Sequence, residues 1–369
     1  MQITPLSAQG LALADSRPRG KSTVFGVQAL RFLAAVLVVI LHALNQEITF
    51  KAHPLPSQQW MQGGVDIFFV ISGFIMVYIV KPDTHPGAFW LQRFTRIAPL
   101  YWIATAVAYV GCLLAPSWFF GPHSAWFALT SALFIPPGNF QWSLPLLSVG
   151  WTLNFEFAFY TILAACLVFR RPPFATATVV IVVIVASGMM LKPYLFFMGY
   201  YADHALMLEF LFGMGAAVLI RDHGLRPWHG LVIAAIGLTL LALLWDFPLG
   251  WPRGIRAGLP AFLVVFGILV SEPLWQRHEA LQQLARLGDA SYSIYLTHFF
   301  FIIALSKLWK TNPGVGALGP IGYLAIAIPL GIAMGILVHL LVERPLLAVA
   351  RTHLGRRRAR RSGTDAAPA

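Results

Sequence analysis

The most unusual chemistry in this sequence is an arginine and a histidine inside one apolar stretch. The segment LRFLAAVLVVILHALN runs from Leu30 to Asn45 and contains Arg31 and His42. Ionisable side chains are costly inside a membrane, so each marks a candidate functional site. Eleven residues of helix turn the chain by about 1100°, which puts both side chains on one face, roughly 16 Å apart along the axis. The simpler interpretation is a snorkelling arginine and an interfacial histidine that bonds a neighbouring helix.

Two carboxylates are expected at the same depth as His42. Asp66 lies near the start of the apolar stretch GGVDIFFVISGF, and Glu156 lies five residues after Trp151 in SVGWTLNFEFAFY. A carboxylate beside an imidazole orients the ring and stabilises its cation, which is the usual way to build a general base. We therefore expect Asp66 or Glu156 to orient His42 in a catalytic site. The alternatives are polar helix ends that face water, or a metal site, for which no ligand spacing is present.

A second arginine pair lies at the predicted depth of Arg31. The segment LQRFTRIAPLYW places Arg93 and Arg96 three residues apart, on one face at the start of a helix. Guanidinium groups bind phosphate oxygens through two parallel N–H donors. The pair predicts a phosphate site, unless the two arginines only anchor the topology.

Possible supporting residues are Trp151 in SVGWTLNFEFAFY, and Tyr295 and His298 in the segment LGDASYSIYLTHFF. Ser291, Tyr295 and His298 share one helix face, and His298 is expected near the middle of the membrane. The alternative is a buried histidine that bonds a tyrosine.

Composition places the chain among integral membrane proteins. Hydrophobic residues make up 58% and charged residues 11% of the 369 residues, whereas soluble domains carry about 25% charged residues. The net charge is +12, and the largest basic cluster is RTHLGRRRARR, after the last apolar run. Such a cluster fixes orientation and contacts anionic lipid, so nucleic-acid binding is not indicated. Both cysteines lie in apolar runs, without the spacing of a metal site or disulfide framework.

Eleven apolar segments are present, and ten of them are long enough to span a bilayer. The weakest segment, 124–135, is expected to be an external loop packed at the interface. The ten predicted spans lie at residues 26–45, 63–80, 97–115, 148–169, 174–191, 203–220, 229–246, 256–271, 289–306 and 320–342.

The positive-inside rule orients these spans. Twenty of the 26 lysines and arginines fall in one set of loops and tails, so both termini are predicted to be cytoplasmic. We expect a disordered cytoplasmic arm at 1–23, a transmembrane domain at 24–345 and a basic disordered cytoplasmic tail at 346–369. The fold class is an all-α polytopic membrane protein, and a bacterial inner (plasma) membrane is the expected location.

The predicted depths suggest a phosphate-holding centre inside and a base outside, joined by one helix face. This arrangement suits an enzyme whose charged donor stays in the cytoplasm while its reactive end reaches an external acceptor. Coenzyme A fits, because its phosphates attract arginines and its pantetheine arm matches the distance from Arg31 to His42.

Several motifs together resemble the bacterial membrane acyltransferase family 3. They are the Arg-x10-His pair, VDIFFVISGF, RFTR, WTLNFEFAFY, YSIYLTH and ERP, which cover about residues 24–345 in this order. The family includes O-antigen and exopolysaccharide O-acetyltransferases. The resemblance implies ten core spans and transfer of an acyl group, commonly acetyl from acetyl-CoA, to a sugar hydroxyl. Acetyl-CoA is then a co-substrate, and no permanently bound cofactor is implied.

The resemblance also assigns roles by motif position. His42 would be the essential base, Arg31 its partner, and Arg93 with Arg96 the donor-side pair, while Glu156 and His298 occupy matching motif positions. A covalent acyl-histidine is the mechanistic alternative. Expected partners are acyl-CoA, a glycan or lipid-linked sugar, membrane lipids and other polysaccharide-assembly proteins. A transporter or flippase for a lipid-linked sugar, or an acyltransferase for a small molecule such as a macrolide, remain alternatives.

Overall fold

The computed structural model describes residues 24–46, 58–81, 83–118, 124–136, 144–169, 172–191, 200–201, 205–221, 224–247 and 250–361. All regular elements in these ranges are helices. The prediction of an all-α polytopic membrane protein is therefore confirmed, whereas the predicted arm at 1–23 lies outside the described residues.

Ten apolar helices correspond to the ten predicted spans. They are α2 (Phe25–Leu44), α4 (Gly63–Ile79), α5 (Pro86–Leu114), α7 (Trp151–Cys166), α8 (Pro173–Leu191), α10 (Met207–Leu219), α11 (Pro227–Leu244), α13 (Gly258–Val270), α16 (Ser291–Thr311) and α18 (Gly319–Val338). Nine helical stretches in the described chain are long and apolar enough to cross a membrane. The exception is α10, which has 13 residues, fewer than the roughly 20 that a spanning helix needs.

The segment at 124–135 is too short to cross the membrane, as predicted. It forms α6 (Ala125–Ala132), an eight-residue helix capped by the Ser124 side chain. Its C-terminal end is held against α5, because the Trp102 indole donates to the Ala132 carbonyl at 2.8 Å.

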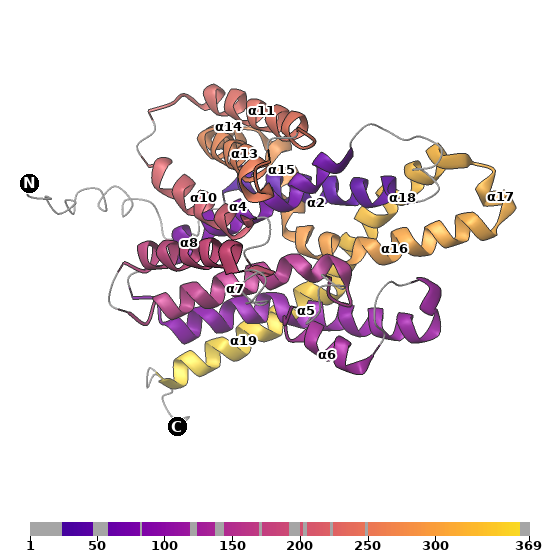
Figure 1. Ribbon diagram of the computed structural model, residues 1–369, viewed down its shortest axis with the longest axis horizontal. Coiled ribbons are helices and arrows are strands. Elements are labelled where there is room, and N and C mark those ends of the chain that lie inside the picture. Colours follow the sequence, from indigo (N-terminus) through magenta and orange to yellow (C-terminus); the bar gives the residue numbers. More distant parts are fainter. Residues whose placement is uncertain are drawn as a thin grey trace, which may run out of the picture.

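Helix α2 lies at the centre of the arrangement, with α4 and α13 on one side and α16 and α18 on the other (Figure 1). Pairs of helices surround it: α4 packs on α10, α11 on α13, and α16 on α18. The α4–α10 pair is so close that a Cβ on Gly213 would lie 1.9 Å from the Val70 carbonyl oxygen. Small residues permit this kind of close helix approach in membranes.

The ends of the bundle differ in chemistry. Successive spans alternate in direction, so the beginnings of α2, α5 and α16 share one end with the C-terminal end of α4. We call this the arginine end, after Arg31, Arg93 and Arg96, and the opposite end the histidine end. Beyond His42, α16 and α18 continue past the end of α2 and are joined by α17 (Pro313–Gly316; Figure 1).

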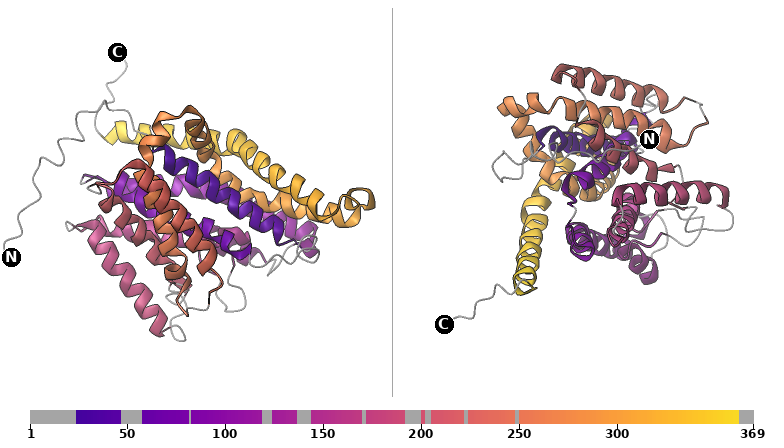
Figure 2. Two further views of the ribbon diagram at one scale, coloured as in Figure 1. Left: turned by 90° about the horizontal axis from the view of Figure 1, so that it is seen from above. Right: turned by 90° about the vertical axis from the view of Figure 1, so that its left-hand side faces the viewer.

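The C-terminal segment differs from the prediction. Residues 344–361 form helix α19 (Arg344–Arg361) instead of a disordered tail beginning at 346. It follows α18 through a π-helical turn, η6 (His339–Glu343), and runs outward along α5 (Figure 2). Alanine, leucine and arginine are strong helix formers, so a basic composition does not by itself imply disorder.

Candidate active site

A cavity of about 410 Å³ lies between α2, α4, α5, α7 and α16. One wall is apolar and comes mainly from α4, including Phe68, Phe69 and Ile75. The charged lining residues are Arg31, Arg93, Arg96 and Glu156, and the polar ones are Gln28, Ser72, Tyr78, Thr152, Tyr160, Tyr292 and Tyr295. Three guanidinium groups against one carboxylate make the described lining cationic.

The structure brings together the three arginines that the sequence suggested as a donor-side group. Arg31 comes from α2, while Arg93 and Arg96 lie one turn apart on α5. The Arg31 guanidinium donates from Nη1 to Gln28 Oε1 at 2.8 Å. Arg93 keeps a buried Nε–H for which the described residues offer no acceptor. A buried donor without a partner costs free energy. An anionic ligand in this cavity could accept that hydrogen bond and remove the cost.

Glu156 does not lie beside His42, contrary to our expectation. It lines the cavity with the arginines, where its Oε1 accepts hydrogen bonds from Tyr160 and, at 3.2 Å, from Ser72. Helix α7 begins at Trp151, and five residues carry Glu156 roughly 7.5 Å further along the axis, toward the arginine end.

His42 is instead paired with His298. The Nδ1 atom of His42 lies 2.9 Å from the Val38 carbonyl and 3.1 Å from Nε2 of His298. The Nδ1 atom of His298 lies 2.9 Å from the Ile294 carbonyl. Carbonyl oxygens only accept, so the Nδ1–H of His298 donates to Ile294, and its Nε2 accepts from the Nδ1–H of His42. No described residue bonds Nε2 of His42, so its lone pair remains able to take a proton.

The environment of His298 also differs from the simpler alternative of a histidine bonded to a tyrosine. Tyr295 donates its hydroxyl proton to the Val149 carbonyl at 2.8 Å, and Thr152 Oγ1 lies 2.9 Å away. The centroid of the Tyr295 ring nevertheless lies 6.3 Å from the centroid of the fully buried His298 ring. Because Tyr295 lines the cavity, it forms the wall between the cavity and the histidine pair.

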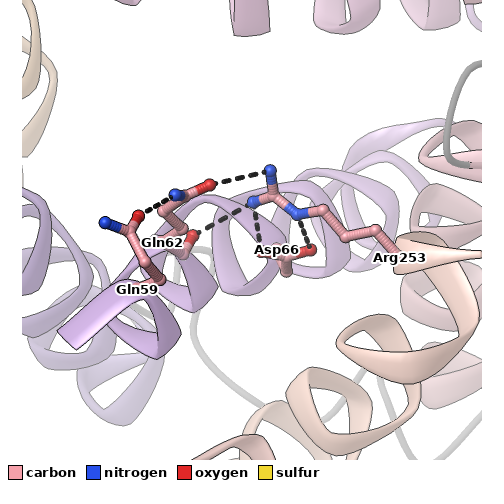
Figure 3. Close-up of polar contacts among 4 residues, drawn as sticks. All are labelled: Gln59, Gln62, Asp66 and Arg253. Atoms are coloured by element: carbon pink, nitrogen blue, oxygen red, sulfur yellow. Dashed lines mark hydrogen bonds and ion pairs between the residues drawn. The ribbon is translucent and has the colours of Figure 1, made fainter. Parts of the chain in front are cut away.

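Asp66 does not orient His42 either, because its carboxylate is bound by Arg253 (Figure 3). The guanidinium donates from Nε to Oδ1 at 3.1 Å and from Nη2 to Oδ2 at 2.7 Å, and it also donates to the side chain and carbonyl of Gln62. Trp151 takes part here, since the Arg253 guanidinium carbon lies 5.7 Å from its ring centroid and 5.1 Å from that of Trp245.

Sequence reasoning missed three buried acidic or basic partners. Arg253 was counted only as a topology signal, although a buried aspartate requires a cation. Glu209 at the start of α10 is fully buried and interacts electrostatically with Asp66 and Arg253. Glu343 in the π-helical turn accepts from Ser293 at 2.6 Å and lies 2.7 Å from Nδ1 of His339. The ERP motif, which contains Glu343, was the available signal for that last group.

No group of three or more His, Cys, Asp or Glu side chains that could hold a metal ion occurs in the part of the chain that the structure describes. The site chemistry available there consists of guanidinium groups, hydroxyls, one cavity carboxylate and two imidazoles.

These features define a multi-pass membrane enzyme with a buried cationic cavity next to a histidine pair. The chain belongs to the acyltransferase 3 family, because residues 24–340 match the family's acyltransferase domain. It is therefore an O-acyltransferase. No solved structure is significantly similar to it.

Among curated relatives, the exopolysaccharide production protein ExoZ of Rhizobium meliloti is 34% identical over 300 residues, which cover 78% of this chain and 90% of ExoZ. Acyltransferase MdmB of Streptomyces mycarofaciens is 27% identical over 82% of this chain and 85% of MdmB. Peptidoglycan O-acetyltransferase OatA of Listeria monocytogenes is 22% identical over 78% of this chain, but the match spans only 51% of OatA.

Proposed function

We propose that the protein transfers an acyl group, acetyl in the first instance, from acyl-CoA to a hydroxyl of an exopolysaccharide, an O-antigen or a lipid-linked glycan. One observation carries this proposal. Helix α2 bears Arg31 in a cationic cavity and, eleven residues on, His42 in the histidine pair. A donor with an anionic end and a reactive end roughly 16 Å apart fits the two positions.

The cavity favours coenzyme A as the carrier of the acyl group. Its three arginines suit the phosphates, because a guanidinium binds phosphate oxygens with two parallel donors. The apolar wall from α4 suits the pantetheine arm, which is uncharged. We infer that the nucleotide lies at the arginine end, and that the thioester reaches past Tyr295 toward His42.

His42 acts as the general base in this proposal. Its Nε2 takes the proton of the acceptor hydroxyl while that oxygen forms a bond to the thioester carbonyl carbon. The carbon–sulfur bond then breaks, and the imidazolium returns the proton to the leaving thiolate, so no proton is gained or lost overall. The Nδ1–H of His42 stays directed at the Val38 carbonyl and at Nε2 of His298. These two acceptors stabilise the transient cation, the role that we had expected of a carboxylate.

The acceptor is inferred from the relatives. ExoZ is named for exopolysaccharide production and OatA for O-acetylation of peptidoglycan, and both names support a polysaccharide hydroxyl as the acceptor. The excess of basic residues in one set of loops supports cytoplasmic termini in a bacterial inner membrane. Acyl-CoA would then arrive from the cytoplasm, and polysaccharide-assembly proteins would deliver the glycan at the opposite face.

The test is acetyl transfer in membrane vesicles that contain the full chain. Radiolabelled acetyl-CoA is supplied on the arginine side, and label in the glycan fraction is measured with and without the protein. We expect His42→Ala to lower transfer by about 10²- to 10⁴-fold, the usual contribution of a general base. The matched control is His278→Ala, because His278 is exposed and does not line the cavity.

Three results would overturn this proposal. Transfer at the wild-type rate by His42→Ala would exclude His42 as the general base. Isolation of an acetylated His42 from a quenched reaction would replace direct transfer by an acyl-histidine route. Movement of a lipid-linked sugar across the membrane with no label transferred would identify a transporter.

A further inference from the structure

The short segment before α16 is packed directly against the first turns of α2. This segment is η5 (Leu287–Ala290), which belongs to the LGDASYS motif. A Cβ on Gly288 would lie 2.1 Å from the carbonyl oxygen of Gln28, so only glycine allows the two backbones to approach this closely. The approach brings Asp289 beside the Gln28 side chain.

A two-step hydrogen-bond relay runs from Asp289 to Arg31. Gln28 Nε2 donates to Asp289 Oδ1 at 2.8 Å, and Arg31 Nη1 donates to Gln28 Oε1 at 2.8 Å. A carboxylate only accepts and a guanidinium only donates, so the orientation of the amide between them is fixed. Gln28 and Arg31 both line the cationic cavity, whereas Asp289 is exposed behind them.

The same chain region also fixes the start of α2. The carboxylate of Glu272 accepts from the backbone N–H groups of Phe25 and Gly26, each at 2.8 Å. These bonds satisfy two of the free donors at the helix N-terminus. Residues 272–289 therefore hold both the first turn of α2 and the side chain of Gln28.

Arg31 needs such a restraint. Arg96 repels its guanidinium, while the carboxylates of Glu156, Glu343 and Asp289 attract it. An arginine side chain has many rotamers, and ordering it costs conformational entropy. A hydrogen bond to a fixed amide restricts those rotamers before any ligand binds.

We propose that Gln28 and Asp289 are positioning residues that hold Arg31 in the orientation in which it binds a phosphate of the acyl donor. Gln28 acts by direct contact with the guanidinium, and Asp289 acts through Gln28. This inference rests on the proposed function, in which acyl-CoA occupies the cavity. Neither residue touches the reacting atoms, so they affect donor affinity and leave the chemical step largely unchanged.

The test compares four variants of the full chain in proteoliposomes: Gln28→Leu, Asp289→Ala, Asp289→Asn and the double variant Gln28→Leu/Asp289→Ala. The KM for acetyl-CoA, the KM for the glycan and kcat are measured for each. We expect Gln28→Leu to raise the KM for acetyl-CoA about tenfold, as for loss of a hydrogen bond to a charged group. Asp289→Ala should raise it about threefold, since that bond is exposed to solvent, and kcat should stay within twofold.

Two variants separate the relay from a general structural defect. Asp289→Asn keeps an oxygen acceptor at the same position, so its KM for acetyl-CoA should stay close to that of the wild type. The double variant should be no worse than Gln28→Leu alone, because the relay is already broken and contacting residues do not act additively. Gln283→Leu on the exposed surface of α15 (Glu279–Arg286) is the matched control and should change nothing.

The relay is refuted if Gln28→Leu leaves the KM for acetyl-CoA unchanged in an active enzyme. It is also refuted if the KM for the glycan rises as much as that for acetyl-CoA, or if Asp289→Asn behaves like Asp289→Ala. A wild-type protein that transfers nothing from acetyl-CoA would overturn the proposed function, and this inference with it. The two failures are therefore distinguishable.

Discussion

Replacing Asp66 with alanine distinguishes a structural role of this carboxylate from a catalytic one. Asp66 is fully buried and binds Arg253 with two hydrogen bonds, while His42 is bonded to Val38 and His298. The variant would leave the largely buried Arg253 guanidinium without its hydrogen-bonded counter-ion, with only the Glu209 carboxylate still attracting it. Removing one partner of a buried ion pair costs about 3–5 kcal/mol of stability. Transfer per folded molecule should fall only a few-fold.

The assay needs both a stability and an activity measurement on the same protein. Unfolding is followed in mixed micelles, and acetyl transfer is normalised to the folded fraction. Arg253→Ala should destabilise by a similar amount, since it leaves Asp66 unpaired. The double variant Asp66→Ala/Arg253→Ala should be less destabilised than the sum of the two by about 1–3 kcal/mol, because contacting residues are coupled. Arg277→Ala, at an exposed position, should change stability by no more than about 0.5 kcal/mol.

The opposite pattern would contradict this reasoning. If Asp66→Ala kept wild-type stability but lost transfer about 100-fold, Asp66 would act on the reaction, and the ion pair with Arg253 would not describe its working state. Additive effects in the double variant would show that the two side chains do not interact in the membrane.

Three further perturbations address the cavity, the histidine pair and the helix packing. Arg93→Ala combined with Arg96→Ala should raise the KM for acetyl-CoA at least tenfold in steady-state assays, because the donor's phosphates lose two guanidinium partners. The KM for the glycan should stay unchanged. His298→Phe should slow transfer only about fivefold, since His42 keeps its bond to Val38 and loses one hydrogen bond of about 1 kcal/mol; a loss equal to that of His42→Ala would contradict this. Gly213→Ala should destabilise by about 1–3 kcal/mol in thermal unfolding, whereas Gly215→Ala, with nothing within 4 Å of its Cβ position, should not.

The membrane-spanning architecture could be predicted because the bilayer constrains each segment separately. Length and apolar composition suffice to locate a helix such as α2, predicted at 26–45 and found at Phe25–Leu44. The same rule overestimates α10, which has only 13 helical residues. It also says nothing about α19, whose helix depends on local propensity rather than on lipid.

The site was predicted only in part, because a span gives the depth of a residue but not the direction in which it faces. Arg31 and His42 lie in one continuous helix, so the expectation of a shared face needs only helix geometry. Predicting the partners of Asp66 and Glu156 required knowledge of which helices are neighbours. The partner of Asp66 lies 187 residues away in sequence, and no local pattern near Asp66 identifies it.

Helix α2 itself explains how one short segment can serve both ends of the reaction. After Gly26 it contains neither glycine nor proline up to Leu44, the residues that most often bend a helix. The separation of Arg31 from His42 is therefore fixed by the rise per residue, not by loops that could adjust. Its arginine end is held by Glu272 and its histidine end contacts α16 through His298. In the proposed function, this rigid spacing selects a donor of one particular length, and the acceptor approaches only the histidine end.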